Sequence, residues 1–446
     1  MRGNQRSLLR EDKVSVLVSE IQFNNGLGSG ALNLRRNRNE VVLVPEWRLG
    51  RSFLPDDSPV AYTLDRAQAG PMTIRAAFSR TDPTLQSVFV RAIQPPRPEP
   101  PWWVQFLLPP DLLWPSRPFF QSYFDYLNFL NYSLFYELWQ ETAIGGGNVL
   151  GEVKPRLIEF GANGVSELET FELANVRLAS RGVSVQNMSW LWQYRLPSDF
   201  VWHDIGQTSH RVYLVISRPT APWSEQPFQI SNTQLPWTDV LDVSCSWASG
   251  ALSADEAAER VTLSVFELGA GLLEYGCPIG AIEMYANTLL NLFDCSAFLE
   301  LLKGGVGNGP YVNCTDCATM VSTFANILGA DLWQSRMGKY VPAFITCPTL
   351  IIGSSEWTSP WRLGLGFTFH EVAWTKSCTA RDDVYDACLM VDAHPPIIGR
   401  LPDPLLVSRM RFGSVDDGQY RDRLTVPADR LTCEPRPFER RRRVVF

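Results

Sequence analysis

The stretch GGVGNGPYVNCTDCATMVSTFANILGADLW, residues 304–333, decides the fold of the second half of the chain. Small and apolar residues follow Cys314 at helical spacing until Gly329, which predicts a helix that begins at Cys314. The backbone N–H groups at a helix N-terminus favour the anionic thiolate, which is the nucleophilic form of cysteine. The glycines before Cys314 leave space for a substrate chain and offer further N–H groups to an oxyanion.

Two later segments carry groups that can act together with a thiolate. The segment GLGFTFHEVAWTK, residues 364–376, has the pattern of an apolar strand and carries His370. The segment VYDACLMVDAHPP, residues 384–396, contains Asp386 and Asp392. Cysteine, histidine and aspartate in this chain order can form a triad of nucleophile, base and orienting acid.

The three segments together resemble the transglutaminase-like superfamily. Its nucleophile motif runs Cys-x-Asp-x-Ala in a helix that ends with Leu-Gly, and here residues 314–318 read CTDCA and residues 328–329 read LG. The resemblance covers about 80 residues in three blocks, within the region from about 240 to 400. It implies an α+β core of the transglutaminase or papain type in this region.

The resemblance implies that Cys314 is the nucleophile, His370 the base and Asp392 the orienting acid at the end of its strand. The sequence departs from the family pattern in two places. Trp374 follows the histidine by four positions instead of the more usual two, and TKSCTARDD lengthens the separation between histidine and acid. The longer separation leaves Asp386 as a second candidate for the acid.

Asn308 lies six residues before Cys314, where the related papain-like enzymes place an amide side chain that binds the oxyanion. An oxyanion role is therefore one interpretation of this residue. The other is a turn, because asparagine beside glycine is typical of turns.

Cys314 and Cys317 also form a C-x-x-C pair, which is compatible with a zinc or redox site. No second such pair occurs in the sequence, and Cys378, Cys388, His370 and His394 do not have the close spacing of structural zinc sites. We therefore expect no metal and no cofactor, and interpret Cys317 as a small core residue of the nucleophile helix.

The expected activity is cysteine-dependent acyl transfer on a protein or peptide amide, through a thioester that water or an amine resolves. We favour hydrolysis, by a protease or deamidase, because water is the ubiquitous acceptor; an amine acceptor would give crosslinking. The alternative from another class is a structural or interaction protein that carries a non-catalytic transglutaminase-like scaffold, because fold does not dictate function.

The first half of the chain alternates apolar and polar residues in short runs separated by turn residues, which predicts β-rich, sandwich-like domains. We predict a multidomain chain with two β-rich domains before the α+β core. The β domains would recognise the substrate or dock a partner. The predicted parts are a β-sandwich-like domain at 1–95, a Pro-rich spacer and helix at 96–145, a second β-rich domain at 146–238 and the catalytic domain at 239–446.

Composition and charge give no indication of nucleic-acid binding, of a membrane span or of export through a signal peptide. The net charge of -7 gives no broad basic footprint for nucleic acid, and we interpret the one basic run, residues 440–443, as a solvated tail. No apolar stretch is long enough to predict a membrane span. Nine cysteines, an odd number, and an N-terminus without an apolar leader favour a cytoplasmic protein and leave delivery without a signal peptide open.

Overall fold

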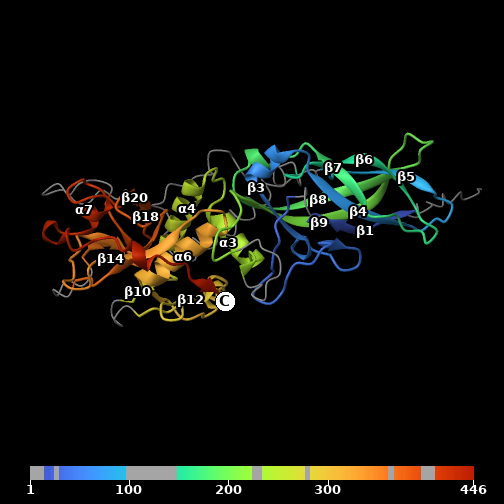
Figure 1. The fold of residues 1–446 in the computed structure, drawn as a ribbon. Helices are drawn as coiled ribbons and strands as arrows, with labels where there is room; N and C mark the ends of the chain where they lie inside the picture. Colours follow the sequence, from blue (N-terminus) through green and yellow to red (C-terminus); the bar gives the residue numbers. More distant parts are fainter. Residues whose placement is uncertain are drawn as a thin grey trace, which may run out of the picture.

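The computed structural model describes residues 15–24, 30–96, 148–223, 234–276, 282–359, 366–392 and 407–446. The predicted aromatic helix and most of the Pro-rich spacer lie outside these residues. Figure 1 shows a β-rich half and a half that combines helices with small sheets, with helix α3 (Thr238–Trp247) between them.

One curled sheet of nine strands makes up the β-rich half. Its order is β2-β1-β4-β7-β6-β5-β8-β9-β3, and only the β3–β9 pair is parallel. The strands are β1 (Val16–Gln22), β2 (Trp47–Arg48), β3 (Pro59–Thr63), β4 (Thr73–Arg80), β5 (Ser87–Ile93), β6 (Glu152–Glu159), β7 (Glu169–Ala174), β8 (Ser184–Arg195) and β9 (His203–Val215). Short 3-10 turns occur at Pro55–Asp57, Leu64–Ala69, Leu178–Ser180, Pro427–Asp429 and Pro437–Glu439.

Strands from the two predicted β domains alternate within this single sheet. Strand β4 pairs with β7, and β5 lies between β6 and β8. The prediction of β structure in both regions agrees with the fold, but the strands of the two predicted β-rich domains form one sheet instead of two separate domains. The alternation of apolar residues identifies a strand and its buried face, whereas it does not identify the strand's partners.

The core of the sheet combines aliphatic side chains with large aromatic ones. Trp190 and Trp192 on β8 are completely buried, and their indole N–H groups donate to the carbonyl of Gly151 at 2.8 Å and to the hydroxyl of Thr208 at 2.9 Å. Each large ring therefore buries its apolar surface while its polar atom keeps a hydrogen-bond partner.

The second half packs helices against small sheets. Besides α3, its helices are α4 (Ala254–Glu267), α5 (Cys295–Leu302), α6 (Cys314–Asn326) and α7 (Tyr420–Leu424). Ser253 caps α4 by accepting a hydrogen bond from the backbone N–H of Glu256 at 3.2 Å. A continuous apolar core runs from Tyr213 in the sheet through Val240 on α3 to α6, so the two halves share buried surface.

The sheets of this half are short. The largest has the order β14-β17-β18-β20, with β14 (Trp333–Met337), β17 (His370–Trp374), β18 (Asp383–Tyr385) and β20 (Arg409–Arg411). The others join β15 (Thr349–Ile351) with β16 (Trp357–Thr358) and β19 (Leu389–Met390), β10 (Glu274–Tyr275) with β13 (Tyr311–Val312), and β12 (Leu292–Phe293) with β11 (Ala286–Asn287) and β21 (Val444–Val445). Helix α6 packs on β17.

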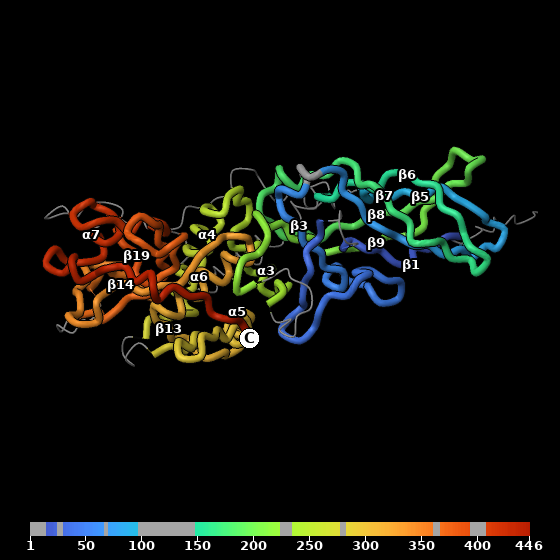
Figure 2. The backbone as a smooth tube through the Cα atoms, in the orientation of Figure 1, coloured from blue at the N-terminus to red at the C-terminus, as the bar shows by residue number. Residues whose placement is uncertain are grey.

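The basic run at residues 440–443 is part of the fold, so its interpretation as a solvated tail is wrong. The guanidinium groups of Arg440 and Arg442 lie 4.1 Å and 3.7 Å from the ring centre of Trp333, and Arg443 is completely buried. Figure 2 shows the end of the chain returning beside α5, where the N–H of Ser296 donates to the carbonyl of Phe446 at 3.1 Å.

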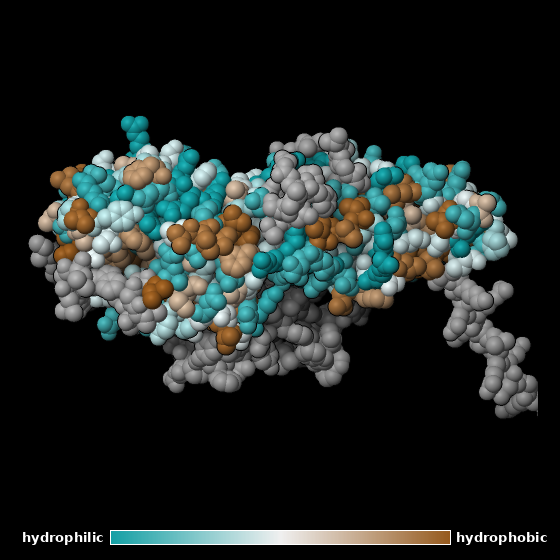
Figure 3. Space-filling view, turned by 60° about the horizontal axis from the view of Figure 1, so that its bottom comes forward, coloured by the Kyte–Doolittle hydropathy of each residue, from teal (hydrophilic) through white to brown (hydrophobic). Residues whose placement is uncertain are grey.

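On the face drawn in Figure 3, apolar residues form small groups separated by hydrophilic ones. Within the described residues, no helix is both long and apolar enough to cross a membrane.

Candidate active site

Cys314 is the first residue of α6, as the sequence predicts. A reciprocal capping box sets this start: the Asn313 side chain accepts from the N–H of Asp316 at 3.0 Å, and the Asp316 carboxylate accepts from the N–H of Asn313 at 3.1 Å. Cys314 is 5% exposed, so its thiol lies at the margin of the core and at the positive end of the helix.

The carboxylate of Asp316 is buried and organises the backbone around the start of α6. Besides Asn313, it accepts hydrogen bonds from the N–H groups of Met284, Tyr285 and Ala286 at 3.1, 2.9 and 2.7 Å. Burial raises the pKa of Asp316 to about 6 against the opposing effect of these N–H groups. The aspartate of the Cys-x-Asp motif therefore ties the 284–286 segment to the helix that carries Cys314.

His370 opens β17 and is completely buried. Its Nε2 lies 2.8 Å from Oδ2 of Asp386, and its Nδ1 has no hydrogen-bond partner among the described residues. Burial lowers the pKa of His370, but the charge and hydrogen bond of Asp386 and the interaction with the Cys314 thiol raise it to about 10. The carboxylate thus occupies one ring nitrogen and leaves the other without a hydrogen-bond partner in the described part of the chain.

Asp386, the second candidate for the acid, is the aspartate that the structure brings to His370. Strand β18 pairs directly with β17, so the residue that follows β18 reaches the imidazole. Asp392 lies two residues beyond β19, which belongs to another sheet. Asp386, which the sequence leaves as the alternative to Asp392, is therefore the candidate acid that hydrogen-bonds the imidazole. The long segment between β17 and β18 makes the separation between the histidine and the acid differ from the family pattern, so the sequence alone did not identify Asp386.

Three other groups hold the Asp386 carboxylate. The Tyr420 hydroxyl donates to Oδ2 at 2.7 Å, and the N–H groups of Cys388 and Leu389 donate to Oδ1 at 2.8 and 3.1 Å. Tyr420 comes from α7 and has no motif that would point to this role. Its contribution could not be found from the sequence.

The side-chain amide of Asn308 contacts polar groups of neighbouring loop segments. Its Nδ2 donates to the carbonyl of Met284 at 2.9 Å and lies 3.4 Å from a carboxylate oxygen of Asp294. These contacts use the amide donors that an oxyanion would need, so the position of Asn308 supports a loop-bracing role and not the predicted oxyanion role.

The other thiols near the site are buried. Burial raises the pKa of Cys388, and a hydrogen bond with Cys317 adds to this shift. Within the described ranges, no group of three or more His, Cys, Asp or Glu side chains is arranged to hold a metal ion. Cys317 lies buried in the apolar core of this half.

No protein-family model matches the chain, and no curated protein matches it. Among solved structures, the crystal structure of red sea bream transglutaminase is similar at a TM-score of 0.31, with 12% sequence identity over 71% of this chain. The match spans 48% of that transglutaminase, about half of its length. A similarity of this size carries no functional argument.

Proposed function

We propose that this chain is a cysteine-dependent acyl-transfer enzyme that acts on an amide of a protein or peptide. The observation that carries the proposal is the buried imidazole of His370, which hydrogen-bonds Asp386 through Nε2 and opens the strand on which the helix of Cys314 packs. A thiol at a helix N-terminus, a histidine beside it and an acid on the far ring nitrogen are the parts that thiol catalysis requires.

In the proposed reaction, Nδ1 of His370 takes the proton of the Cys314 thiol, and the sulfur attacks the substrate carbonyl carbon. The backbone N–H groups at the start of α6 face the oxygen that becomes negative. The imidazolium returns its proton to the leaving nitrogen as the carbon–nitrogen bond breaks, which leaves a thioester on Cys314. Asp386 keeps the imidazole oriented and stabilises its cationic form.

We propose that water resolves the thioester, with His370 removing a proton from it to release a carboxylic acid and regenerate the thiol. Resolution by an amine would give crosslinking instead. Incubation with dimethylcasein and a dansylated amine separates these outcomes. An amine acceptor makes the casein fluorescent, whereas hydrolysis leaves it non-fluorescent and gives either glutamate in place of glutamine or cleaved peptides; a carboxamide releases ammonia in both cases.

A non-catalytic scaffold is the second candidate, and the burial of the site favours it. His370 is completely buried and Cys314 nearly so, although a substrate must reach the sulfur. In this alternative the triad is a remnant that stabilises the core.

The rate of iodoacetamide alkylation at each cysteine, read by peptide mass spectrometry, distinguishes the two candidates. We expect Cys314 to react about tenfold faster than the half-buried Cys347 near pH 6, and His370→Asn to remove that advantage. His203→Asn, at an exposed histidine, is the matched control. Equal reactivity of Cys314 and Cys347, unaffected by His370→Asn, would favour the scaffold.

A further inference from the structure

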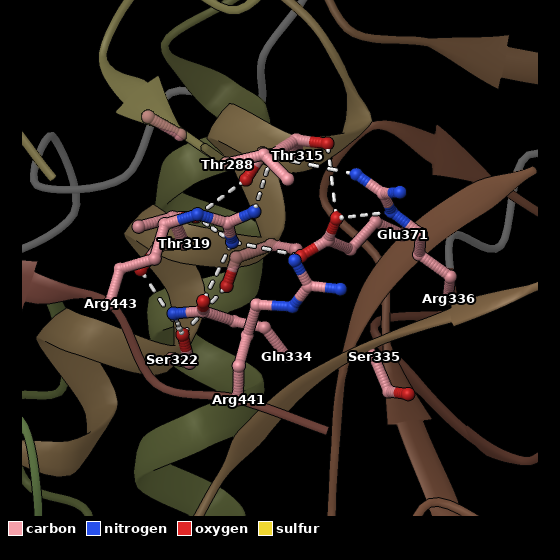
Figure 4. A network of polar contacts seen from close by, with 12 residues as sticks. Thr288, Thr315, Thr319, Ser322, Gln334, Ser335, Arg336, Glu371, Arg441 and Arg443 are labelled. Carbon is pink, nitrogen blue, oxygen red and sulfur yellow. Dashed lines mark hydrogen bonds and ion pairs between the residues drawn. The ribbon is translucent and has the colours of Figure 1, made fainter. Parts of the chain in front are cut away.

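A second buried network lies beside the candidate triad and uses the next residue along each of its two elements. Thr315 follows Cys314 on α6, and Glu371 follows His370 on β17. The Thr315 hydroxyl donates to Oε2 of Glu371 at 3.2 Å, and both residues are completely buried. Figure 4 shows this contact within a larger set of polar side chains.

Glu371 is a buried charge, and two arginines compensate it. Nη1 of Arg443 lies 2.8 Å from Oε1, and Nε of Arg336 lies 3.1 Å from Oε2. Burial raises the pKa of Glu371, but the charges of Arg443, Arg336 and Arg441 outweigh it and lower this pKa. Glu371 therefore remains an acceptor-only carboxylate that can hold the Thr315 hydroxyl in a fixed direction.

Arg443 connects the elements around this carboxylate. Its Nη1 also lies 2.9 Å from the hydroxyl of Thr319 on α6 and 2.7 Å from the amide oxygen of Gln334 on β14. Its Nη2 lies 2.9 Å from the hydroxyl of Thr288. One planar guanidinium thus joins α6, β14, β17 and the segment before β12, as Figure 4 shows.

We propose that Thr315, Glu371 and Arg443 form a positioning clamp that fixes α6 and β17 relative to each other and so keeps the thiol of Cys314 aligned with His370. The inference rests on the proposed function. The clamp residues do not touch the reacting atoms. They act by fixing the backbone positions of α6 and β17, which carry Cys314 and His370. This matters for the rate because a displacement of about 1 Å between reacting groups can lower a rate about 100-fold.

Thr315→Val tests the clamp with the least disturbance, because it removes the hydroxyl and keeps the shape of the side chain and both buried charges. Thr323→Val is the matched control: Thr323 is on the same helix, is completely buried, and its hydroxyl has no hydrogen-bond partner among the described residues. Thr315→Ser keeps the hydroxyl and should restore the contact.

The readout is the iodoacetamide rate at Cys314 near pH 6, together with the melting temperature. We expect Thr315→Val to lower the rate about tenfold, while Thr315→Ser and Thr323→Val stay close to wild type. Glu371→Gln should lower the rate further. A merely structural role would lower the melting temperature of Thr315→Val without changing the rate at Cys314.

His370→Asn separates failure of the clamp from failure of the proposed function. If His370→Asn lowers the rate and Thr315→Val does not, the clamp is wrong and the catalytic pair stands. If neither substitution changes the rate, both inferences are wrong, because there is no pair to position.

Discussion

Two completely buried histidines, one in each half of the molecule, have opposite electrostatic surroundings. The ring nitrogens of His210 on β9 have hydroxyl partners, with Nδ1 2.8 Å from Ser58 and Nε2 2.9 Å from Thr208, and burial lowers the pKa of His210 to about 3. His370 meets the Asp386 carboxylate and the Cys314 thiol, which raise its pKa to about 10 although burial opposes them. The chemistry of the partner, and not the depth of burial, separates a neutral core histidine from one suited to pair with a thiolate.

Asp386→Asn should have the largest effect, because it would give His370 a neutral partner and so remove the electrostatic difference between His370 and His210. We expect the alkylation rate of Cys314 near pH 6 to fall about 100-fold, since the imidazolium loses the charge that stabilises it. The free energy of unfolding should fall by about 3 kcal/mol, as is typical when one member of a buried ion pair is removed. Peptide mass spectrometry and urea unfolding measure the two effects.

Asp392→Asn is the control for this substitution, because Asp392 lies beyond β19 in a different sheet. It should leave the alkylation rate unchanged. A larger effect from Asp392→Asn than from Asp386→Asn would contradict the assignment of the acid.

The two histidines should also give opposite dependences of stability on pH. The pKa of His210 lies below its ordinary value, so its contribution is complete above about pH 6.5 and is lost as the pH falls toward 3, at about 1.4 kcal/mol per pH unit. The pKa of His370 lies above that value, so its contribution is complete below about pH 6.5 and is lost as the pH rises toward 10.

Urea unfolding at a series of pH values, on His210→Gln and His370→Gln, measures these contributions. His210→Gln should flatten the acid side of the stability profile and His370→Gln the alkaline side. Identical profiles of stability against pH for the two variants would contradict the opposite directions of the pKa shifts of His210 and His370.

Tyr420→Phe separates the effect of the hydrogen bond to Asp386 from the effect of the charge of Asp386. It removes the hydrogen bond and leaves the charge in place. The free energy of unfolding should fall by about 1–2 kcal/mol, and Cys314 should keep most of its low-pH reactivity. Tyr385→Phe is the control, since the hydroxyl of Tyr385 reaches only Asp255 at 3.4 Å. A loss of reactivity as large as that of Asp386→Asn would mean that the hydroxyl, and not the charge, controls His370.

Ser58→Ala should have the smallest effect. It removes a hydroxyl from His210, which is expected to cost about 1 kcal/mol of stability and to leave the alkylation of Cys314 unchanged. Thermal unfolding and the alkylation assay check both parts. A change at Cys314 would show that the core of the nine-stranded sheet influences the candidate site.

The start of α6 could be predicted because its signals are local. Asn313 and Asp316 are three residues apart and cap the same turn, and the apolar spacing after Cys314 is that of a helix. The choice between Asp386 and Asp392 depends on which strand pairs with β17, and this pairing leaves no local mark in the sequence.

The contribution of Arg443 was hidden for a related reason. A run of four arginines is typical of a solvated segment, and only tertiary pairing with Glu371 shows that one of them is buried. The glutamate within the apolar segment GFTFHEVAW was a signal that a buried charge requires a partner. The sequence therefore indicated that Glu371 requires a positively charged partner, but it did not identify which arginine is that partner.

The central claim, that Cys314 forms an acyl-enzyme with the help of His370, is tested most directly by incubation with p-nitrophenyl acetate. We expect a burst of about one nitrophenolate per chain and an acetyl group on Cys314, both absent in Cys314→Ala, strongly reduced in His370→Asn and retained in Cys317→Ala. No burst, or acetylation distributed over other residues and unaffected by His370→Asn, would contradict it.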